Sequence, residues 1–270
     1  MDAPKLHADT VGSGPSVLLL HGQPGSKMDW KAVASELALD HTVIIPDRPG
    51  YGLTGGMANG FFDNADRLVD LMDSDGIENT IVVGHSWGGG VALALTQRHP
   101  SRVTGLVLAA SVGISQTDIV DRVLGLPIAG HVLAFVALQG MGRALLSERA
   151  RRSMGRGLSG VDEEHLRESV SSWMSSSAWR SFHREQKSYL KEISFIEESL
   201  GGISVPTIVV IGSKDPLIRP SSAKRLARRI AGSKIMWIDG AGHFLPLVAP
   251  SSIAEAVRNL SRHDAWQGEQ

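Results

Sequence analysis

The pentapeptide Gly84-His85-Ser86-Trp87-Gly88 constrains the fold of this chain more than any other feature. It follows the apolar run 80–83, which is typical of a buried strand, and it precedes a segment with helical spacing that stops at Pro100. A sharp turn between a strand and a helix lifts a serine hydroxyl above the edge of a sheet, and flanking glycines relieve the crowding of that backbone. We therefore predict a strand–turn–helix unit that presents Ser86 as a nucleophile.

Short apolar runs alternate with longer amphipathic segments along most of the chain. Strands are expected at 17–20, 42–46, 80–83, 103–109, 207–211 and 234–238, and helices at 63–75, 87–99, 223–231 and 253–261. This order is typical of an α/β fold with a mostly parallel central sheet that is flanked by helices.

The alternation stops between residues 112 and 202, where helical patterns replace the apolar runs. These patterns cover 119–126, 131–138, 163–174 and 182–196. The serine-rich stretch 169–177 resembles a linker by composition, but Trp173, Met174 and Trp179 give it an apolar face. We predict a core formed by residues 1–111 and 203–270, with residues 112–202 inserted as a helical cap.

A serine hydroxyl needs a base and an orienting carboxylate before it becomes a good nucleophile. His243 follows the last predicted strand in a loop of small residues, which makes it the preferred base. Asp215 follows the strand 207–211 and is the preferred carboxylate, although its place before Pro216 is also typical of a turn. Asp239 is a rival, ranked second because it lies only four residues before His243 in the same tight loop.

The loop His21-Gly22-Gln23-Pro24-Gly25 follows the strand 17–20 and is expected to complete the site. The backbone N–H groups of Gln23 and Trp87 are the candidate donors to an oxyanion, since Pro24 has no N–H group to give. His21 is expected to hold this loop and to have no part in the chemistry. Together these residues predict acyl transfer through a tetrahedral intermediate.

The set of motifs resembles the α/β-hydrolase superfamily over nearly the whole chain. The matching segments are H-G-Q-P-G at 21–25, D-R-P-G-Y-G at 47–52, G-H-S-W-G-G at 84–89, Asp215 and G-A-G-H at 240–243. The order Ser86, Asp215, His243 is that of this superfamily. The resemblance implies an α/β-hydrolase fold and a cofactor-free serine hydrolase, with a structural role for Asp47. Only about sixteen residues precede the first buried strand, so the usual leading hairpin is expected to be short or incomplete.

Several activities remain open within this resemblance. Haloalkane dehalogenases and epoxide hydrolases are similar at the Gln23-Pro24 and Trp87 positions, but their nucleophile is aspartate and Ser86 argues against both. Proline iminopeptidases would need cap carboxylates, and Glu163, Glu164 and Glu168 are expected instead to form a solvated helix face. Carbon–carbon bond hydrolases and cofactor-free haloperoxidases share the triad and stay as alternatives. A non-catalytic ligand receptor is a further alternative, for which a damaged triad would be expected.

Composition removes other classes of function. The formal charge of −1 excludes a globally basic nucleic-acid binder, and the absence of cysteine removes thiolate catalysis and Cys-ligated zinc. No His, Asp and Glu cluster has metal-ligand spacing. No 18-residue apolar run predicts a membrane span, and the first ten residues lack the apolar core of a signal peptide. We expect a cytoplasmic monomer or homodimer that cleaves an ester or related acyl bond of a small to medium, largely apolar substrate.

Overall fold

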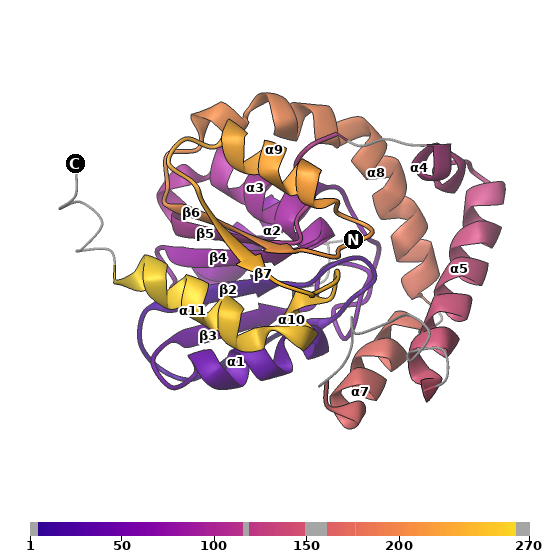
Figure 1. The fold of residues 1–270 in the computed structure, drawn as a ribbon, viewed down its shortest axis with the longest axis horizontal. Coiled ribbons are helices and arrows are strands. Elements are labelled where there is room, and N and C mark those ends of the chain that lie inside the picture. Colours follow the sequence, from indigo (N-terminus) through magenta and orange to yellow (C-terminus); the bar gives the residue numbers. More distant parts are fainter. Residues whose placement is uncertain (1–4, 116–118, 149–160, 176, 263–270) are drawn as a thin grey trace.

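The computed structural model describes residues 5–115, 119–148, 161–175 and 177–262. Its centre is a seven-stranded sheet with the order β1-β3-β2-β4-β5-β6-β7 (Figure 1). The strands are β1 (Ala8–Val11), β2 (Ser16–Leu20), β3 (Thr42–Pro46), β4 (Thr80–His85), β5 (Val103–Ala109), β6 (Thr207–Gly212) and β7 (Lys234–Ile238). All neighbours pair in parallel except β1 and β3. The predicted α/β fold with a mostly parallel sheet is confirmed.

Helices cover both faces of the sheet because the strand side chains alternate between two cores. In β4, Val82 points into one core, whereas Ile81 and Val83 point into the other. The first core is covered by α2 (Phe61–Ser74), α3 (Trp87–Arg98) and α9 (Pro220–Arg229). The second is covered by α1 (Lys31–Leu37), α10 (Leu245–Val248) and α11 (Pro250–Ser261). Burial on both faces explains why the inner strands β2 to β6 appear in the sequence as apolar runs.

Strand β1 was missed by the sequence reasoning, and its position explains why. It pairs only with β3, in the register Ala8↔Pro46; Ala8 is half-buried, and residues 9–11 are exposed. An edge strand with solvent on one side lacks the apolar run on which the predictions relied. In place of the usual leading hairpin, the described residues contain this one antiparallel strand. Residues 1–4, with which the predicted core begins, lie outside the described residues.

The described residues between β5 and β6 form helices joined by short non-helical segments and contain no strand, as predicted. Its helices are α4 (Ile119–Leu124), α5 (Ala129–Leu146), α7 (Glu163–Trp173) and α8 (Ala178–Glu198), which lie together at one side of the sheet (Figure 1). Helix α7 packs on the short helix η1 (Lys27–Trp30), and α8 packs on α2 and α3. By length and composition alone α5 could cross a membrane, but it packs along α8 and α7.

Candidate active site

Ser86 occupies a strained turn between β4 and α3. Its backbone has φ 52°, a left-handed conformation that is costly for a residue with a side chain. The turn can be this tight because the glycines on either side of Ser86 lack a Cβ atom. A Cβ atom placed on Gly84 would lie 2.5 Å from the Gly88 carbonyl oxygen and from the Gly89 Cα atom. A Cβ atom on Gly88 would lie 2.4 Å from the Leu20 carbonyl oxygen. The glycines quoted in the sequence motif therefore allow the serine to stand at the sheet edge.

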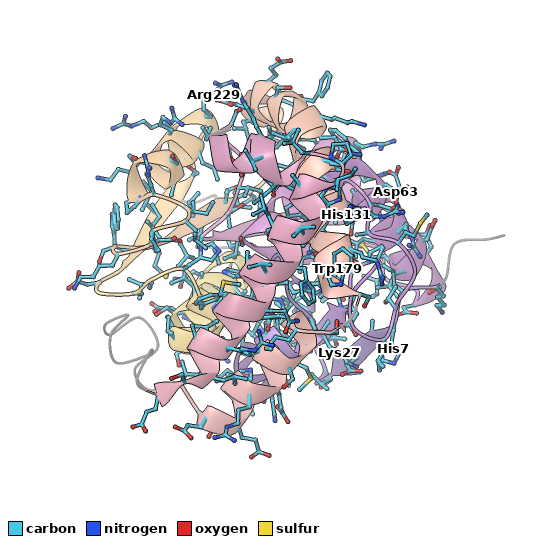
Figure 2. All side chains as sticks on the ribbon, turned by 90° about the vertical axis from the view of Figure 1, so that its right-hand side faces the viewer. His7, Lys27, Asp63, His131, Trp179 and Arg229 are labelled. Atoms are coloured by element: carbon cyan, nitrogen blue, oxygen red, sulfur yellow. The ribbon has the colours of Figure 1, made fainter. Side chains whose placement is uncertain are left out.

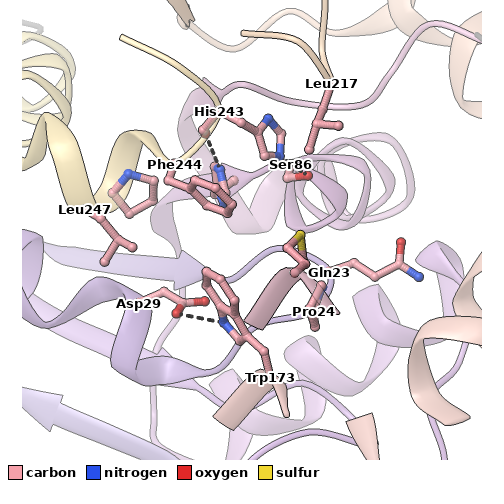
Figure 3. Close-up of a pocket in the computed structure, with 12 residues that line it drawn as sticks. Gln23, Pro24, Asp29, Ser86, Trp173, Leu217, His243, Phe244 and Leu247 are labelled. Carbon is pink, nitrogen blue, oxygen red and sulfur yellow. Dashed lines mark hydrogen bonds between the residues drawn. The ribbon is translucent and has the colours of Figure 1, made fainter. Parts of the chain in front are cut away.

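The structure brings Ser86, His243 and Asp215 together in one hydrogen-bonded chain. The distance from Ser86 Oγ to His243 Nε2 is 2.9 Å, and that from His243 Nδ1 to Asp215 Oδ2 is also 2.9 Å. Asp215 is 5% exposed, and its other oxygen accepts hydrogen bonds from the backbone N–H groups of Leu217 and Ile218. With Nδ1–H donating to Asp215, Nε2 is left to accept the serine proton. Figure 3 shows the His243 ring beside Ser86.

The rival carboxylate Asp239 does not face the imidazole. Its Oδ1 atom accepts a hydrogen bond from the Ser213 hydroxyl at 3.1 Å, whereas Asp215 takes His243 Nδ1. The geometry thus agrees with the ranking of Asp215 over Asp239. The reason is the one anticipated, since a tight loop cannot turn Asp239 back toward a ring four residues away.

His85 is a buried neighbour of Ser86 and His243 that the sequence did not single out. It is buried, and burial lowers its pKa to about 3, so the ring is neutral at ordinary pH. Its Nε2–H group donates to the carbonyl oxygen of His243 at 2.9 Å. His85 therefore fixes the backbone that carries the base. Its position in the sequence could have drawn attention to it, because His85 directly precedes Ser86 in the motif that forms the turn.

The loop after β2 approaches the nucleophile closely, as predicted. A Cβ atom on Gly22 would lie 3.1 Å from the Ser86 Cβ atom, so only glycine lets the loop come this near. The Gln23 side chain donates from Nε2 to the Phe182 carbonyl oxygen of α8 at 2.8 Å. Within the described part of the chain, no residue accepts a hydrogen bond from the backbone N–H of Gln23 or Trp87. Both predicted donors remain available to a ligand.

A buried ion pair behind this loop was also missed. Arg48 is fully buried and donates from Nε to the His21 carbonyl oxygen at 2.9 Å and from Nη2 to the Gly22 carbonyl oxygen at 2.7 Å. Its Nη1 group binds the Glu185 carboxylate of α8. The guanidinium also lies 4.5 Å from the centre of the Trp87 ring. Arg48 thus contacts the loop and the residue that carry the two candidate oxyanion donors.

The ring of His21 holds the same loop, in agreement with its expected structural role. Its Nδ1–H group donates to the Gly22 carbonyl oxygen at 3.0 Å, and Nε2 accepts from the backbone N–H of Arg48 at 2.9 Å. Burial, with Arg48 nearby, lowers the pKa of His21 well below its usual value, so the ring stays neutral. Tyr51 donates its hydroxyl to Glu185 at 2.6 Å and completes the network.

Other carboxylates that the sequence raised lie outside the site. Asp47 accepts from the backbone N–H groups of Lys27 and Leu53 at 2.9 Å each, so it stabilises a turn, as expected. Glu163 and Glu164 are exposed, and Glu168 pairs with Lys31 at 2.9 Å. The expected solvated helix face fits these glutamates, and none of them lines the cavity beside Ser86.

A narrow cavity of about 40 Å³ opens onto Ser86. Its lining residues, from the core and from the helical insertion, are Gln23, Pro24, Asp29, His85, Ser86, Met141, Trp173, Leu217, His243, Phe244, Pro246 and Leu247. The wall is mostly apolar, and no described lysine or arginine lines it. Of the three apolar side chains noted for the serine-rich stretch, Trp173 lines this cavity, whereas Met174 and Trp179 do not.

One wall of the cavity joins the core to the insertion through Asp29 and Trp173. Asp29 Oδ1 accepts from the Trp173 indole N–H at 3.2 Å (Figure 3). Its Oδ2 atom accepts from the Ser26 backbone N–H, also at 3.2 Å. Burial raises the pKa of Asp29 to about 7. The Trp173 ring stacks on Phe244 with 5.4 Å between centroids, next to the base. Across the described residues, no three His, Asp or Glu side chains gather in a way that could hold a metal.

Comparison with known proteins identifies the family to which this chain belongs. The model of the alpha/beta hydrolase fold family matches residues 15–250. An uncharacterized Mycobacterium tuberculosis protein (strain H37Rv) is 29% identical over 87% of this chain and 71% of its own length. The 2-hydroxymuconate semialdehyde hydrolase of Pseudomonas sp. strain CF600 is 27% identical over 94% of this chain and 89% of its own. A thermophilic esterase from Thermogutta terrifontis, 24% identical, superposes with a TM-score of 0.76 over 95% of this chain and 93% of its own. The chain therefore belongs to the alpha/beta hydrolase fold family.

Proposed function

We propose that this protein is a serine hydrolase that cleaves an ester or related acyl bond through an acyl-enzyme on Ser86. The observation that carries the proposal is the chain of two 2.9 Å hydrogen bonds from Ser86 to His243 and from His243 to Asp215. A serine in a strained turn, a base that can accept its proton and a buried carboxylate that orients the base are the parts that nucleophilic acyl transfer needs.

The reaction follows from these positions. Ser86 Oγ attacks the substrate carbonyl while His243 Nε2 accepts its proton, and Asp215 stabilises the imidazolium that forms. The backbone N–H groups of Gln23 and Trp87 donate to the oxyanion of the tetrahedral intermediate, a contribution of about 2.7–4 kcal/mol per donor. His243 then protonates the leaving group. Water, activated by the same imidazole, hydrolyses the acyl-enzyme and releases Ser86.

The described helices of the insertion act as a cap in this proposal. Met141 from α5 and Trp173 from α7 line the cavity beside Ser86, and Gln23 of the core bonds to Phe182 of α8. The narrow apolar wall favours a small, uncharged acyl substrate, since desolvating a charged group there would be costly. This division places residues 1–111 and 203–270 in the core and residues 112–202 in the cap, whose segments 116–118, 149–160 and 176 lie outside the described residues.

Hydrolysis of a carbon–carbon bond on the same triad is the second candidate. The observation that favours it is the similarity to the semialdehyde hydrolase from Pseudomonas, which is 27% identical over 94% of this chain. The cavity favours the ester, because an anionic dienoate would meet the Asp29 carboxyl group and no lysine or arginine among the described lining residues. Turnover of 4-nitrophenyl acetate and of a vinylogous 1,5-diketone acid, measured on one preparation, separates the two.

A fluorophosphonate probe tests the proposed nucleophile. We expect covalent labelling of the wild type and none of Ser86→Ala, with slow labelling of His243→Ala because the proton acceptor is lost. The control is Ser213→Ala, a hydroxyl near the same sheet edge that bonds to Asp239. Labelling that survives in Ser86→Ala would refute the assignment.

A further inference from the structure

Helix α5 is apolar on its outer face as well as on its inner face. Its buried stripe consists of Gly130, Ala134, Leu138, Gly142 and Leu145. On the outer side Val132, Phe135 and Val136 are 59%, 47% and 58% exposed. No charged residue occurs from Ile128 to Gly142. A helix whose outer face meets only water normally carries polar side chains there, so this face needs an apolar or amphipathic partner.

A cationic groove lies beside this face, between α8 and the start of α2. It has a volume of about 490 Å³, and its lining residues are Ala58, Asn59, Gly60, Asp63, His131, His183, Arg184, Lys187, Ser188 and Lys191. Arg184, Lys187 and Lys191 are exposed, and no described carboxylate lies within ion-pair distance of them. Asp63 is the one carboxylate in the described lining, so the groove carries a net positive charge.

The apolar face and the groove form one continuous surface. His131 of α5 lines the groove, and its ring lies 3.9 Å from His183 and 5.3 Å from Trp179, measured between centroids. Phe135, one turn further along α5, lies 6.0 Å from the same Trp179 ring. Figure 2 looks onto this side, with His131 and Trp179 beside α5. We call the outer side of α5 together with the groove the α5 face.

We propose that the α5 face docks onto the surface of a membrane that contains anionic phospholipids. The exposed Val132, Phe135 and Val136 side chains enter the boundary between headgroups and acyl chains, while Arg184, Lys187 and Lys191 bind lipid phosphates. Charge complementarity selects this partner over a second copy of the chain. A symmetric dimer on the α5 face would bring two cationic grooves to one interface with no counter-charge. The inference is independent of which bond Ser86 cleaves.

Co-sedimentation of the full chain with vesicles tests the proposal. We expect binding to vesicles of phosphatidylcholine mixed with phosphatidylglycerol at low salt, weaker binding at high salt, and little binding to phosphatidylcholine alone. Lys187→Gln combined with Lys191→Gln is expected to weaken binding about fivefold for each charge lost, or about 25-fold in total. Phe135→Asp combined with Val136→Asp is expected to abolish it.

Matched variants on other surfaces provide the controls. Arg225→Gln combined with Arg228→Gln removes the same charge from the exposed side of α9, and Leu39→Asp places a charge at a side chain that is 84% exposed. Both are expected to bind vesicles within twofold of the wild type. None of these residues lies in the active site, so each folded variant is expected to be labelled by fluorophosphonate as the wild type is. This labelling, together with circular dichroism, establishes that each variant is folded.

Three results would overturn the proposal. The first is equal loss of binding in the α8 and α9 charge variants, which would indicate unspecific attraction to negative charge. The second is the absence of vesicle binding by the wild type. The third is a dimer in sedimentation velocity that Phe135→Asp with Val136→Asp converts to a monomer, which would assign the α5 face to a second copy of the chain.

Discussion

Substitution of Arg48 by lysine tests whether the buried ion pair positions the oxyanion donors. The guanidinium donates to the carbonyl oxygens of His21 and Gly22 and to the Glu185 carboxylate, and it also lies on the Trp87 ring. Lysine keeps the positive charge, so Glu185 retains a counter-ion. Its single ammonium group cannot reproduce three hydrogen bonds in the planar geometry of arginine.

The structure gives the size of the expected effects. Each hydrogen bond from a charged donor contributes about 1.5–3 kcal/mol, so loss of the two bonds to the loop lowers the free energy of unfolding by about 3–6 kcal/mol. The Gln23 amide follows directly after those two carbonyl groups. A displacement of about 1 Å in a catalytic group costs on the order of 100-fold in rate. We expect kcat for 4-nitrophenyl acetate to fall by about 10- to 100-fold, with KM changed by less than about threefold.

Tyr51→Phe is the matched control, because it removes one hydrogen bond to Glu185 and leaves the bonds from Arg48 to the loop intact. It is expected to lower the free energy of unfolding by about 1 kcal/mol and to leave kcat within twofold of the wild type. Urea unfolding gives the stabilities, and kcat is referred to the fraction of folded protein. If Arg48→Lys is destabilised but keeps wild-type kcat and fluorophosphonate labelling rate, the positioning role is wrong.

Three further predictions have definite expected outcomes. In steady-state kinetics Asp215→Asn is expected to lower kcat by about 10⁴-fold, whereas the kcat of Asp239→Asn is expected to stay within about tenfold of the wild type. A larger loss of kcat in Asp239→Asn than in Asp215→Asn would reverse the ranking of the two carboxylates. The folded-state pKa of Asp29, about 7, exceeds the unfolded value of about 3.9, so the free energy of unfolding falls as pH rises from about 4 to about 7. Asp29→Asn removes the titrating carboxyl group, so between about pH 4 and pH 7 the Tm of the variant is expected to change less than the Tm of the wild type. If the two proteins show the same dependence of Tm on pH, Asp29 does not cause that dependence. Gly84→Ala places a Cβ atom 2.5 Å from the Gly88 carbonyl oxygen and is expected to cost about 1–3 kcal/mol in urea unfolding, whereas Gly201→Ala, with open space around it, leaves stability nearly unchanged.

The parts of the fold that the sequence predicted well are those buried on both sides. Strands β3 and β5 begin and end at the predicted residues, since their runs of Val, Ile and Leu inside the sheet have no solvent face to interrupt them. The exception is β7, an exposed edge strand that also matches its predicted bounds, because residues 235–238 form an unbroken apolar run. Strand β1 and helix α1 escaped prediction because one is an exposed edge strand and the other has only seven residues. Helix α5 extends past the predicted span 131–138 on both sides, because its glycines and its apolar outer face hide the helical period.

At the site, residues within a short motif could be predicted, and those joined only by the fold could not. Ser86 and His243 lie 157 positions apart, yet each stands in a glycine-rich turn after a strand, which marks it in the sequence. Arg48 and Glu185 are 137 positions apart, and nothing local distinguishes Glu185 from the other charged residues of α8. Its burial follows from how α8 packs against the core, a property of tertiary structure. His85 lies at a variable position inside the recognised motif, and its contact with the His243 carbonyl oxygen is formed only by the fold.

The central claim is that catalysis proceeds through an acyl group on Ser86, and rapid-quench mass spectrometry during turnover of 4-nitrophenyl acetate tests it most directly. We predict that the peptide containing Ser86 gains one acetyl group within the first turnover, in step with a burst of 4-nitrophenol. In Ser86→Ala both the modified peptide and the burst are expected to disappear. Full-rate turnover with no acetyl group on Ser86, or with the group on another residue, would contradict the account.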